Sequence, residues 1–372
     1  MKKVLFVIDS LNGGGAEKIL LEIINSLNPK EYQVDLMTVW NRGDYISQLP
    51  STIPYHTIVK RPGNKWFDKL YGFMIEKSIK YLSCRLLHAL FRPGKYDVEI
   101  AFLEGASTKI VAGATCKKYA WVHTDMKSNT WYEQFYRNKR ETSSVYNRFT
   151  EVIYVSKSLN DSFEERYGKV RSRVIHNPLD TKTIKLKSEF PCNFEIDNSC
   201  TSIVSVGRLE KEKGFDRLID IAADLKEKAY KFNIYIIGKG REESHLYQLC
   251  IEKQVKDCVH LIGFYNNPYP IIKQMDIFVC PSRVEGYSTV VAEALVLGLP
   301  VITTLCAGMK ELLTNGEHGV ITENNRDALE RGIEALISQP EKIKILREKS
   351  ANRGAEISLE NSVKEIEELI NG

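Results

Sequence analysis

Short apolar runs alternate with longer amphipathic segments along almost the whole chain, and this alternation constrains the fold more than any other feature. Runs typical of buried strands in the first half occupy residues 4–8, 34–39, 98–102, 118–122 and 151–155. Those in the second half occupy residues 201–206, 232–237, 259–262, 277–280 and 300–303. Segments such as 17–27, 214–227 and 242–253 carry apolar residues at helical spacing. Strands that alternate with helices predict parallel, doubly wound α/β sheets.

The length of the chain predicts two such sheets rather than one. A single hydrophobic core rarely serves 372 residues, whereas two domains of ordinary size account for them. The segment 181–199 is polar, contains Pro191 and lacks periodicity, so it is the expected linker. Two doubly wound domains that face each other would create a cleft at the carboxyl ends of their strands, where open α/β sheets bind ligands.

Composition excludes several classes of protein. No apolar run reaches the roughly 18 residues that a membrane-spanning helix needs. The amino-terminal run breaks at Asp9 with no small-residue cleavage site after it, so we expect a first buried strand rather than a signal peptide. The eight cysteines form no Cys-x-x-Cys pair and have no His cluster beside them, which favours reduced thiols in a cytoplasmic protein over disulfides or zinc.

One stretch of the chain, residues 60–95, is strongly basic. It holds nine Lys and Arg against two acidic residues, together with many aromatic and aliphatic side chains. We interpret it as one or two basic amphipathic helices, which could lie on an anionic membrane surface. The alternative is a helix that packs on the core and leaves its basic face in water. Nucleic acid is not the expected partner, because no nucleic-acid-binding module accompanies the stretch.

The segment 278–297, FVCPSRVEGYSTVVAEALVL, joins an apolar strand to a turn and then to a helix expected to begin near 286–289. Glu285 and Glu293 lie eight residues apart, a little over two helical turns, so both are predicted to face one side. The free N–H groups at the helix mouth suit a phosphate, and a carboxylate further along suits paired sugar hydroxyls. The pattern is typical of a nucleotide-sugar site; the alternative is two glutamates on an ordinary helix surface. The mouth is formed by Gly286, Tyr287, Ser288 and Thr289.

Cationic residues follow another strand, 201–206. Arg208 comes two residues after it, and Lys213 comes just before Gly214 opens a helix. An arginine fork and a lysine point charge suit a diphosphate, although EKEK is also a common solvated pattern. Two other strand ends carry weaker signals: Gly238, Lys239 and Gly240 are expected to line a nucleotide, and Phe264 is expected to flank its base.

The first half offers a glycine loop and a histidine. Gly13, Gly14 and Gly15 separate the first strand from the first helix and would let a diphosphate or an acceptor approach the backbone, unless they form a plain tight turn. They match neither a full dinucleotide fingerprint nor a Walker loop. His123 ends the strand 118–122 and is either structural or placed at a reaction centre. Asp125 is better explained as a helix cap.

Four segments together resemble the retaining glycosyltransferases of family four, which have the GT-B architecture of two Rossmann-like domains. They are the segment with Glu285 and Glu293, VGRLEKEKGFDRLI, LNGGGAEK and WVHTD. The resemblance implies that Glu293 binds ribose, that Glu285 contacts the donor sugar and that Arg208 and Lys213 bind the diphosphate. It places His123 near the transferred sugar. The run Tyr287–Ser288–Thr289 departs from the family pattern and leaves the donor sugar open.

This resemblance also sets the expected organisation and activity. It implies an acceptor-side domain at 1–185, a donor-binding domain at 186–355 and a helix within 356–372 that packs back on the first domain. The expected enzyme moves a hexose-type sugar from a nucleotide-diphosphate donor, with a UDP-sugar as the expected donor, to a glycan or lipid-linked glycan in surface polysaccharide synthesis. Alternatives are a GT-B nucleotide-sugar epimerase and a non-catalytic nucleotide-sugar binding protein.

No metal is expected in this reaction. No pair of aspartates in an Asp-x-Asp setting follows a strand, and Arg208, Lys213 and a helix mouth can supply the positive charge instead. The protein is expected in the cytoplasm, either free or attached peripherally to the inner face of the membrane. Its donor sugar, acceptor, linkage and oligomeric state do not follow from the sequence.

Overall fold

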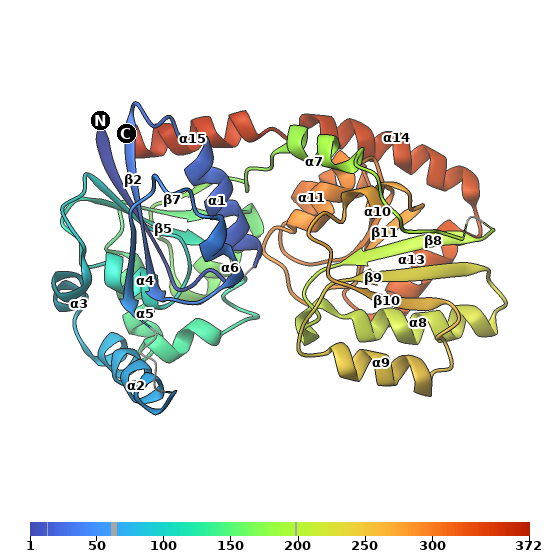
Figure 1. The fold of residues 1–372 in the computed structure, drawn as a ribbon, viewed down its shortest axis with the longest axis horizontal. Coiled ribbons are helices and arrows are strands. Elements are labelled where there is room, and N and C mark those ends of the chain that lie inside the picture. The colour runs from blue at the N-terminus through green and yellow to red at the C-terminus, as the bar shows by residue number, and fades with distance from the viewer. Residues whose placement is uncertain (13, 61–64, 198) are drawn as a thin grey trace. The chain divides into compact units, whose positions relative to one another are not determined.

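Two parallel sheets, one in each half of the chain, form the framework of the protein in a computed structural model (Figure 1). The structure describes residues 1–12, 14–60, 65–197 and 199–372, and the side chains of 65–69 lie outside the description. The chain divides into two units, and the first consists of Met1–Pro178 and Glu360–Gly372. The second unit consists of Leu179–Leu359. The predicted α/β class with two doubly wound sheets is confirmed.

The sheet of unit 1 has seven described strands in the order β3-β2-β1-β4-β5-β6-β7, all paired in parallel. One of its inner strands is the apolar run near the amino terminus, in which Val4 pairs with Val34 on one side and Val98 on the other. The expected first buried strand is therefore confirmed. The strands are β1 (Lys2–Ile8), β2 (Tyr32–Trp40), β3 (Tyr55–Val59), β4 (Val98–Ala101), β5 (Lys117–Val122), β6 (Glu151–Tyr154) and β7 (Ser172–Val174).

Helices of unit 1 follow the strands and cover the sheet. They are α1 (Gly15–Ser26), η1 (Asp44–Gln48), α2 (Lys65–Tyr81), α3 (Cys84–Phe91), α4 (Ala106–Val111), η2 (Trp131–Phe135), α5 (Lys139–Tyr146) and α6 (Lys157–Tyr167). The last helix of the chain, α15 (Leu359–Asn371), also lies on this unit (Figure 1). The Lys2 ammonium donates to the Ile370 carbonyl at 3.1 Å, and the Tyr119 hydroxyl donates to that of Leu369 at 2.8 Å.

The sheet of unit 2 has six described strands in the order β10-β9-β8-β11-β12-β13, also parallel. Successive residues of β8, such as Ile203 and Val204, belong to separate hydrophobic clusters because neighbouring side chains point to opposite faces of a strand. Both faces are therefore covered, as a doubly wound sheet requires. The strands are β8 (Thr201–Val206), β9 (Phe232–Ile237), β10 (Val259–Gly263), β11 (Ile277–Cys280), β12 (Val301–Thr304) and β13 (Val320–Thr322).

The helices of unit 2 correct the expected linker. Asp180 caps a helix at 181–188 by accepting a hydrogen bond from the Thr183 N–H at 2.9 Å, so the first part of the polar segment is helical. The two units divide between Pro178 and Leu179 rather than at residue 185. The helices are α7 (Thr181–Ser188), η3 (Lys211–Lys213), α8 (Phe215–Glu227), α9 (Glu243–Glu252), α10 (Tyr269–Lys273), α11 (Thr289–Val296), α12 (Met309–Leu312), η4 (Thr314–Gly316), α13 (Arg326–Ile337) and α14 (Pro340–Glu356).

Two general expectations can also be compared with the structure. Within the described residues, no helix combines the length and the apolar character that crossing a bilayer would need. All eight cysteines lie in the described part of the chain, and each is a free thiol there.

Candidate functional site

The loop after β8 places Arg208 and Lys213 at the carboxyl edge of the sheet in unit 2. The loop turns tightly: Gly214 has a φ of +71°, and a Cβ there would lie 2.2 Å from the carbonyl oxygen of Pro281. Only glycine fits so close an approach between the loops that follow β8 and β11. The sequence therefore brings Lys213 beside the turn after β11, which carries Glu285.

Lys213 and Glu285 form an ion pair. The Lys213 ammonium lies 2.7 Å from Glu285 Oε1, and the Ser282 hydroxyl donates to the same oxygen at 2.6 Å. Burial by itself lowers the pKa of Lys213, but the Glu285 carboxylate outweighs burial and raises that pKa, so the ammonium stays charged. The positive charge of Arg208, whose side chain is exposed, also acts on Lys213. These three predicted residues therefore lie close together.

A second ion pair, which the sequence did not suggest, ties the same two loops together. The Arg283 guanidinium binds both carboxylate oxygens of Asp216 at 2.7 and 2.6 Å, and it also donates to the carbonyl of Lys211. The N–H of Arg283 donates to the Glu212 carbonyl at 2.7 Å. Bidentate pairs of this kind fix geometry as well as adding energy. They hold the turn with Glu285 against the loop with Lys213.

The start of α11 falls within the predicted range 286–289, but the predicted position of Glu285 on the same helical stripe as Glu293 is wrong. The helix begins at Thr289, with Ser288 as its N-cap, so Glu285 lies in the turn before the helix and not on the same helical stripe as Glu293. The Ser288 hydroxyl does not cap the helix, and its oxygen is buried without a partner among the described residues. The loop with Gly308 packs closely against Gly286, because a Cβ on Gly308 would lie 2.5 Å from the carbonyl oxygen of Gly286. The helix mouth is therefore held in place without a side-chain cap.

Glu293 lies inside α11 and is almost fully buried, with 4% of its surface exposed. Its Oε1 accepts a hydrogen bond from the Tyr269 hydroxyl at 3.3 Å. Tyr287, in the turn before the helix, is largely buried, and burial raises the pKa of its hydroxyl to about 12. Glu293 is thus a fixed carboxylate behind the helix mouth.

The loops after β9 and β10 complete this edge of unit 2. A Cβ on Gly238 would lie 1.9 Å from the carbonyl oxygen of Gly207, so the glycine allows the loops after β8 and β9 to touch. The Phe264 side chain is 58% exposed, and the Lys239 ammonium lies over its ring at 4.9 Å. An exposed aromatic ring with a cation on it can stack on a base. Sequence reasoning identified Gly238, Lys239 and Phe264, but it did not predict that the Lys239 ammonium lies over the Phe264 ring.

In unit 1, the glycine loop leads into α1. Gly14 is the N-cap with an extended backbone, Gly15 is the first helical residue, and Gly13 lies outside the described residues. A Cβ on Gly14 would lie 2.4 Å from a carboxylate oxygen of Glu17, so an acidic side chain already covers the first turn of the helix. This arrangement favours an acceptor-facing loop over a diphosphate site.

His123 follows β5 and is held from several sides. Its N–H donates to Glu104 Oε1 at 2.5 Å, and its ring centroid lies 4.7 Å from that of Phe102. Burial lowers the pKa of the imidazole to about 3, so the ring is neutral at physiological pH. Its Nε2 is buried without a partner in the described part of the chain. Asp125 instead accepts from the Ser128 and Ser162 hydroxyls, which makes it a structural residue.

Two buried carboxyl groups that the sequence analysis missed lie at the same edge of unit 1. Asp9 follows β1, and its Oδ1 accepts from the Ser107 N–H at 2.9 Å. Glu104 follows β4, and its Oε1 also accepts from the Thr124 N–H at 2.7 Å. Single acidic residues after strands gave no motif that could have revealed them. Their environment becomes visible only in the folded chain.

Comparison with known families accounts for both units. The family described as "Glycosyltransferase Family 4" matches residues 13–183, and the one described as "Glycosyl transferases group 1" matches residues 189–353. The first match lies almost wholly in unit 1, and the second lies in unit 2.

Similar proteins cover the full length of the chain. An uncharacterized glycosyltransferase of Haemophilus influenzae is 26% identical, over 98% of this chain and 99% of its own. A Campylobacter jejuni enzyme named as an N-acetylgalactosaminyltransferase acting on a diphospho-undecaprenol-linked sugar is 25% identical, with 95% of each chain covered. The crystal structure of Anabaena HepE with UDP and glucose has the same fold, with a TM-score of 0.78, 18% identity and full coverage of both chains. The chain therefore belongs to the family-four glycosyltransferases of the GT-B fold.

Proposed function

We propose that this glycosyltransferase transfers a hexose-type sugar from a UDP-sugar to a lipid-linked glycan, with retention of configuration, in the synthesis of a surface polysaccharide. The observation that carries the proposal is the gathering of Arg208, Lys213 and the open mouth of α11 at one edge of unit 2. The name of the Campylobacter relative supports a lipid-linked acceptor, and the ligands of HepE support UDP as the nucleotide.

The diphosphate is the part of the donor that this edge fits best. Arg208 and Lys213 supply positive charge, and the uncapped N–H groups of α11 supply donors for the distal phosphate. Glu285 holds the Lys213 ammonium at 2.7 Å, so the lysine is positioned before the donor arrives. Glu293, buried and bonded to Tyr269, is assigned to the ribose hydroxyls, and the exposed ring of Phe264 to the base.

The transfer itself breaks one bond and forms another at the anomeric carbon. The bond to the phosphate oxygen breaks, the pair of electrons leaves with UDP, and the acceptor hydroxyl attacks from the same face. Its proton passes to the departing phosphate. Arg208 and Lys213 stabilise the negative charge that develops on the leaving diphosphate. Electrostatic stabilisation of this kind is usually the largest single contribution to catalysis. The neutral His123 would donate or accept a hydrogen bond at the sugar rather than act as a base.

The test is a screen of UDP-sugars by UDP release and by thermal shift, because a ligand of the native state raises the melting temperature. The proposal expects one UDP-sugar to raise the melting temperature and to release UDP faster when a lipid-linked glycan is added. Conversion of the sugar without UDP release, followed by NMR, would indicate an epimerase instead. Binding with no release from any donor would indicate a non-catalytic binding protein.

A surface of unit 1 supports attachment to a membrane, and we call it the α2–α3 surface. Of the fifteen large apolar side chains that are strongly exposed among the described residues, seven lie within 21 consecutive residues: Leu70, Tyr71, Phe73, Met74, Tyr81, Leu86 and Leu90. Scattered apolar side chains are normal on a protein surface, but a cluster of this size is not. Trp66, Phe67, Lys65 and Lys69 belong to the same basic stretch, but their side chains lie outside the described residues.

Basic side chains accompany this apolar cluster. The Lys77 ammonium lies over the ring of Phe73 at 5.1 Å and over that of Tyr81 at 5.9 Å, and Arg85 is exposed nearby in sequence. Apolar rings with lysines and arginines beside them suit the headgroup region of an anionic bilayer. The partner of this surface in the proposal is therefore the inner face of the cell membrane.

Liposome co-sedimentation tests the attachment. The Phe73→Ser, Met74→Ser double variant should bind vesicles of phosphatidylglycerol and phosphatidylcholine several-fold more weakly than the wild type. Leu186→Ser with Phe190→Ser is the matched control, because these side chains are as exposed but lie in unit 2. Equal binding of both double variants would remove the α2–α3 surface from the proposal.

A further inference from the structure

Three neighbouring strands of unit 1, namely β1, β4 and β5, are each followed by a buried ionisable side chain. Asp9 is 5% exposed and Glu104 is fully buried. Within the described residues, one polar atom of each side chain has no hydrogen-bond partner: Asp9 Oδ2, Glu104 Oε2 and His123 Nε2. Burying such atoms without partners costs free energy, so their recurrence at one edge of a sheet calls for a ligand.

We propose that Asp9, Glu104 and His123 form a hydroxyl-binding site for a sugar ring on unit 1. The inference rests on the proposed function and goes further by adding Asp9 and Glu104, which neither the motifs nor the comparisons single out, to His123. Glu104 has two roles in it: its Oε1 fixes the His123–Thr124 turn through two N–H groups, and its Oε2 faces the ligand.

The chemistry of the group selects a sugar over other ligands. Two carboxyl groups repel a phosphate. In the described part of the chain, no three His, Cys, Asp or Glu side chains are arranged to hold one metal ion. A sugar ring instead carries hydroxyl groups spread around its edge, each of which can donate to a carboxylate or bond to a neutral imidazole.

The electrostatics of the site agree with a neutral ligand. Burial raises the pKa of the Asp9 carboxyl to about 7 and that of the Glu104 carboxyl to about 7. The two carboxyls also act on each other, since the charge of Asp9 raises the pKa of Glu104 further. Arg42, after β2, lowers the pKa of Asp9, and the hydroxyls of Tyr136 and Tyr146 interact electrostatically with the carboxyls. A partly protonated carboxyl can donate as well as accept a hydrogen bond, which suits hydroxyl groups.

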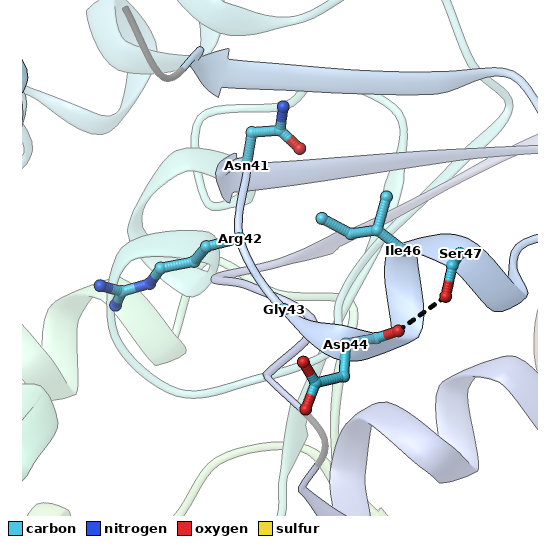
Figure 2. Close-up of a pocket in the computed structure, with 6 residues that line it drawn as sticks. All are labelled: Asn41, Arg42, Gly43, Asp44, Ile46 and Ser47. Carbon is cyan, nitrogen blue, oxygen red and sulfur yellow. Dashed lines mark hydrogen bonds between the residues drawn. The ribbon is translucent and has the colours of Figure 1, made fainter. Parts of the chain in front are cut away.

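A pocket lies at the loop after β2, which is hydrogen-bonded to the segment around Asp9, although Asp9, Glu104 and His123 do not line it. It has a volume of about 490 Å³ and is lined by the chain from Asn41 to Ser47, at the end of β2 (Figure 2). The Leu11 N–H donates a hydrogen bond to the Arg42 carbonyl oxygen at 3.0 Å, and this bond connects the pocket wall to the segment after Asp9. Figure 2 shows the side chains of Arg42 and Asp44 extending in different directions from this loop.

Two sugars could occupy the site, namely the sugar that is transferred and the terminal sugar of the acceptor. The experiment separates them with two variants that keep the bonds within the protein. In Asp9→Asn and Glu104→Gln, the amide oxygen can still accept from the N–H groups of Ser107, or of His123 and Thr124. Glu99→Gln is the matched control, because Glu99 is a buried carboxylate on β4 whose two oxygens both bond to His88.

The first arm measures binding of UDP, UDP-glucose and UDP-N-acetylgalactosamine by calorimetry. The second arm measures binding of methyl glycosides of the same sugars, in the presence of UDP, by saturation-transfer NMR. Asp9→Asn and Glu104→Gln should each weaken binding in one arm by about three- to ten-fold, because an amide NH2 replaces an oxygen that accepts a hydrogen bond from a sugar hydroxyl. If the site binds the donor sugar, the variants should bind UDP-sugars more weakly but UDP unchanged. If the site binds the acceptor sugar, the variants should bind only the methyl glycosides more weakly.

Changes of less than two-fold in both arms, for both variants, would overturn the site. A wild type that binds methyl glycosides but neither UDP nor UDP-sugars would leave the site standing while contradicting the proposed function. If the wild type binds UDP-sugars and the variants bind all ligands equally well, the proposed function would stand but the hydroxyl-binding site would be contradicted. A loss of melting temperature without a change in either arm would assign Asp9 and Glu104 a purely structural role.

Discussion

The two units carry different chemistry at the same edge of a parallel sheet. In unit 2, the strand ends carry cations, and Lys213 is already paired with Glu285. In unit 1, they carry the carboxyls of Asp9 and Glu104 and the neutral ring of His123, each with a buried atom that lacks a partner in the described part of the chain. The difference agrees with the proposed division of roles, in which unit 2 binds the charged diphosphate and unit 1 binds neutral hydroxyl groups.

The largest expected effect comes from removing the cations of unit 2. Arg208→Ala and Lys213→Ala should each lower the rate of UDP release by about ten- to a hundred-fold, because one hydrogen bond to a charged group contributes roughly 1.5–3 kcal/mol. The rate is measured with the preferred UDP-sugar and its acceptor. Lys228→Ala is the matched control, since Lys228 is an ion-paired lysine elsewhere in the same unit. Near-normal rates in both variants would refute the assigned roles.

The second prediction uses the pKa values of unit 1. Asp9 and Glu104 have folded-state pKa values of about 7 against ordinary values of 3.8 and 4.5, so the native state binds more protons between these limits. Their contribution to stability is therefore present at low pH and is lost as the pH rises through about 7. Melting temperatures of the wild type should fall over this window. Glu104→Gln should flatten the fall and gain roughly 2–4 °C relative to the wild type at high pH.

Asp125→Asn is the control for this pH dependence. Burial raises the pKa of Asp125, but hydrogen bonds from Ser128 and Ser162 outweigh it and lower that pKa. Its contribution is present above its ordinary pKa and is lost only below it, so the variant should melt lower by a constant amount between pH 5 and 8. A Glu104→Gln profile parallel to that of the wild type would mean that Glu104 is ionised throughout.

Local sequence signals located unit 2 better than unit 1. The strands β8, β9 and β11 were predicted to the residue, because each is a short, mainly apolar run that is largely buried on both faces. The short strands β3, β7 and β13 were missed, since they lie at or near the sheet edges and are only partly buried. The helix α7 was missed because its lysines and threonines show no clear apolar stripe.

The same contrast holds for the candidate site. Arg208, Lys213 and Glu285 were predicted from the sequence because they lie in segments that resemble family motifs. In the structure, Lys213 and Glu285 form an ion pair. Asp9 and Glu104 were missed, because an acidic residue after a strand is common and looks the same whether it is solvated or buried. Their burial depends on packing between segments that are about a hundred residues apart in the sequence. The hydrogen bond from the Ser107 N–H to Asp9 is one example of such a contact.

The third prediction concerns the base rather than the phosphates and expects a smaller effect. Lys239→Ala and Phe264→Ala should each weaken UDP binding about two- to five-fold, because an exposed cation–π contact is worth roughly 0.5–1 kcal/mol. Calorimetry with UDP and with inorganic pyrophosphate measures it. The affinity for pyrophosphate should stay unchanged in Phe264→Ala, since the ring has no part in binding phosphate. Equal losses for both ligands would place Phe264 away from the base.

The last prediction expects no effect at all. If Arg208, Lys213 and the mouth of α11 supply the positive charge for the leaving diphosphate, a divalent cation has no remaining task there. The rate of UDP release in excess EDTA should therefore equal the rate with Mg²⁺ or Mn²⁺. Lys213→Ala sharpens the test, because a metal ion that could replace the missing ammonium would restore part of its activity. Complete loss of wild-type activity in EDTA, reversed only by adding the metal, would contradict the assignment of the diphosphate to protein cations alone.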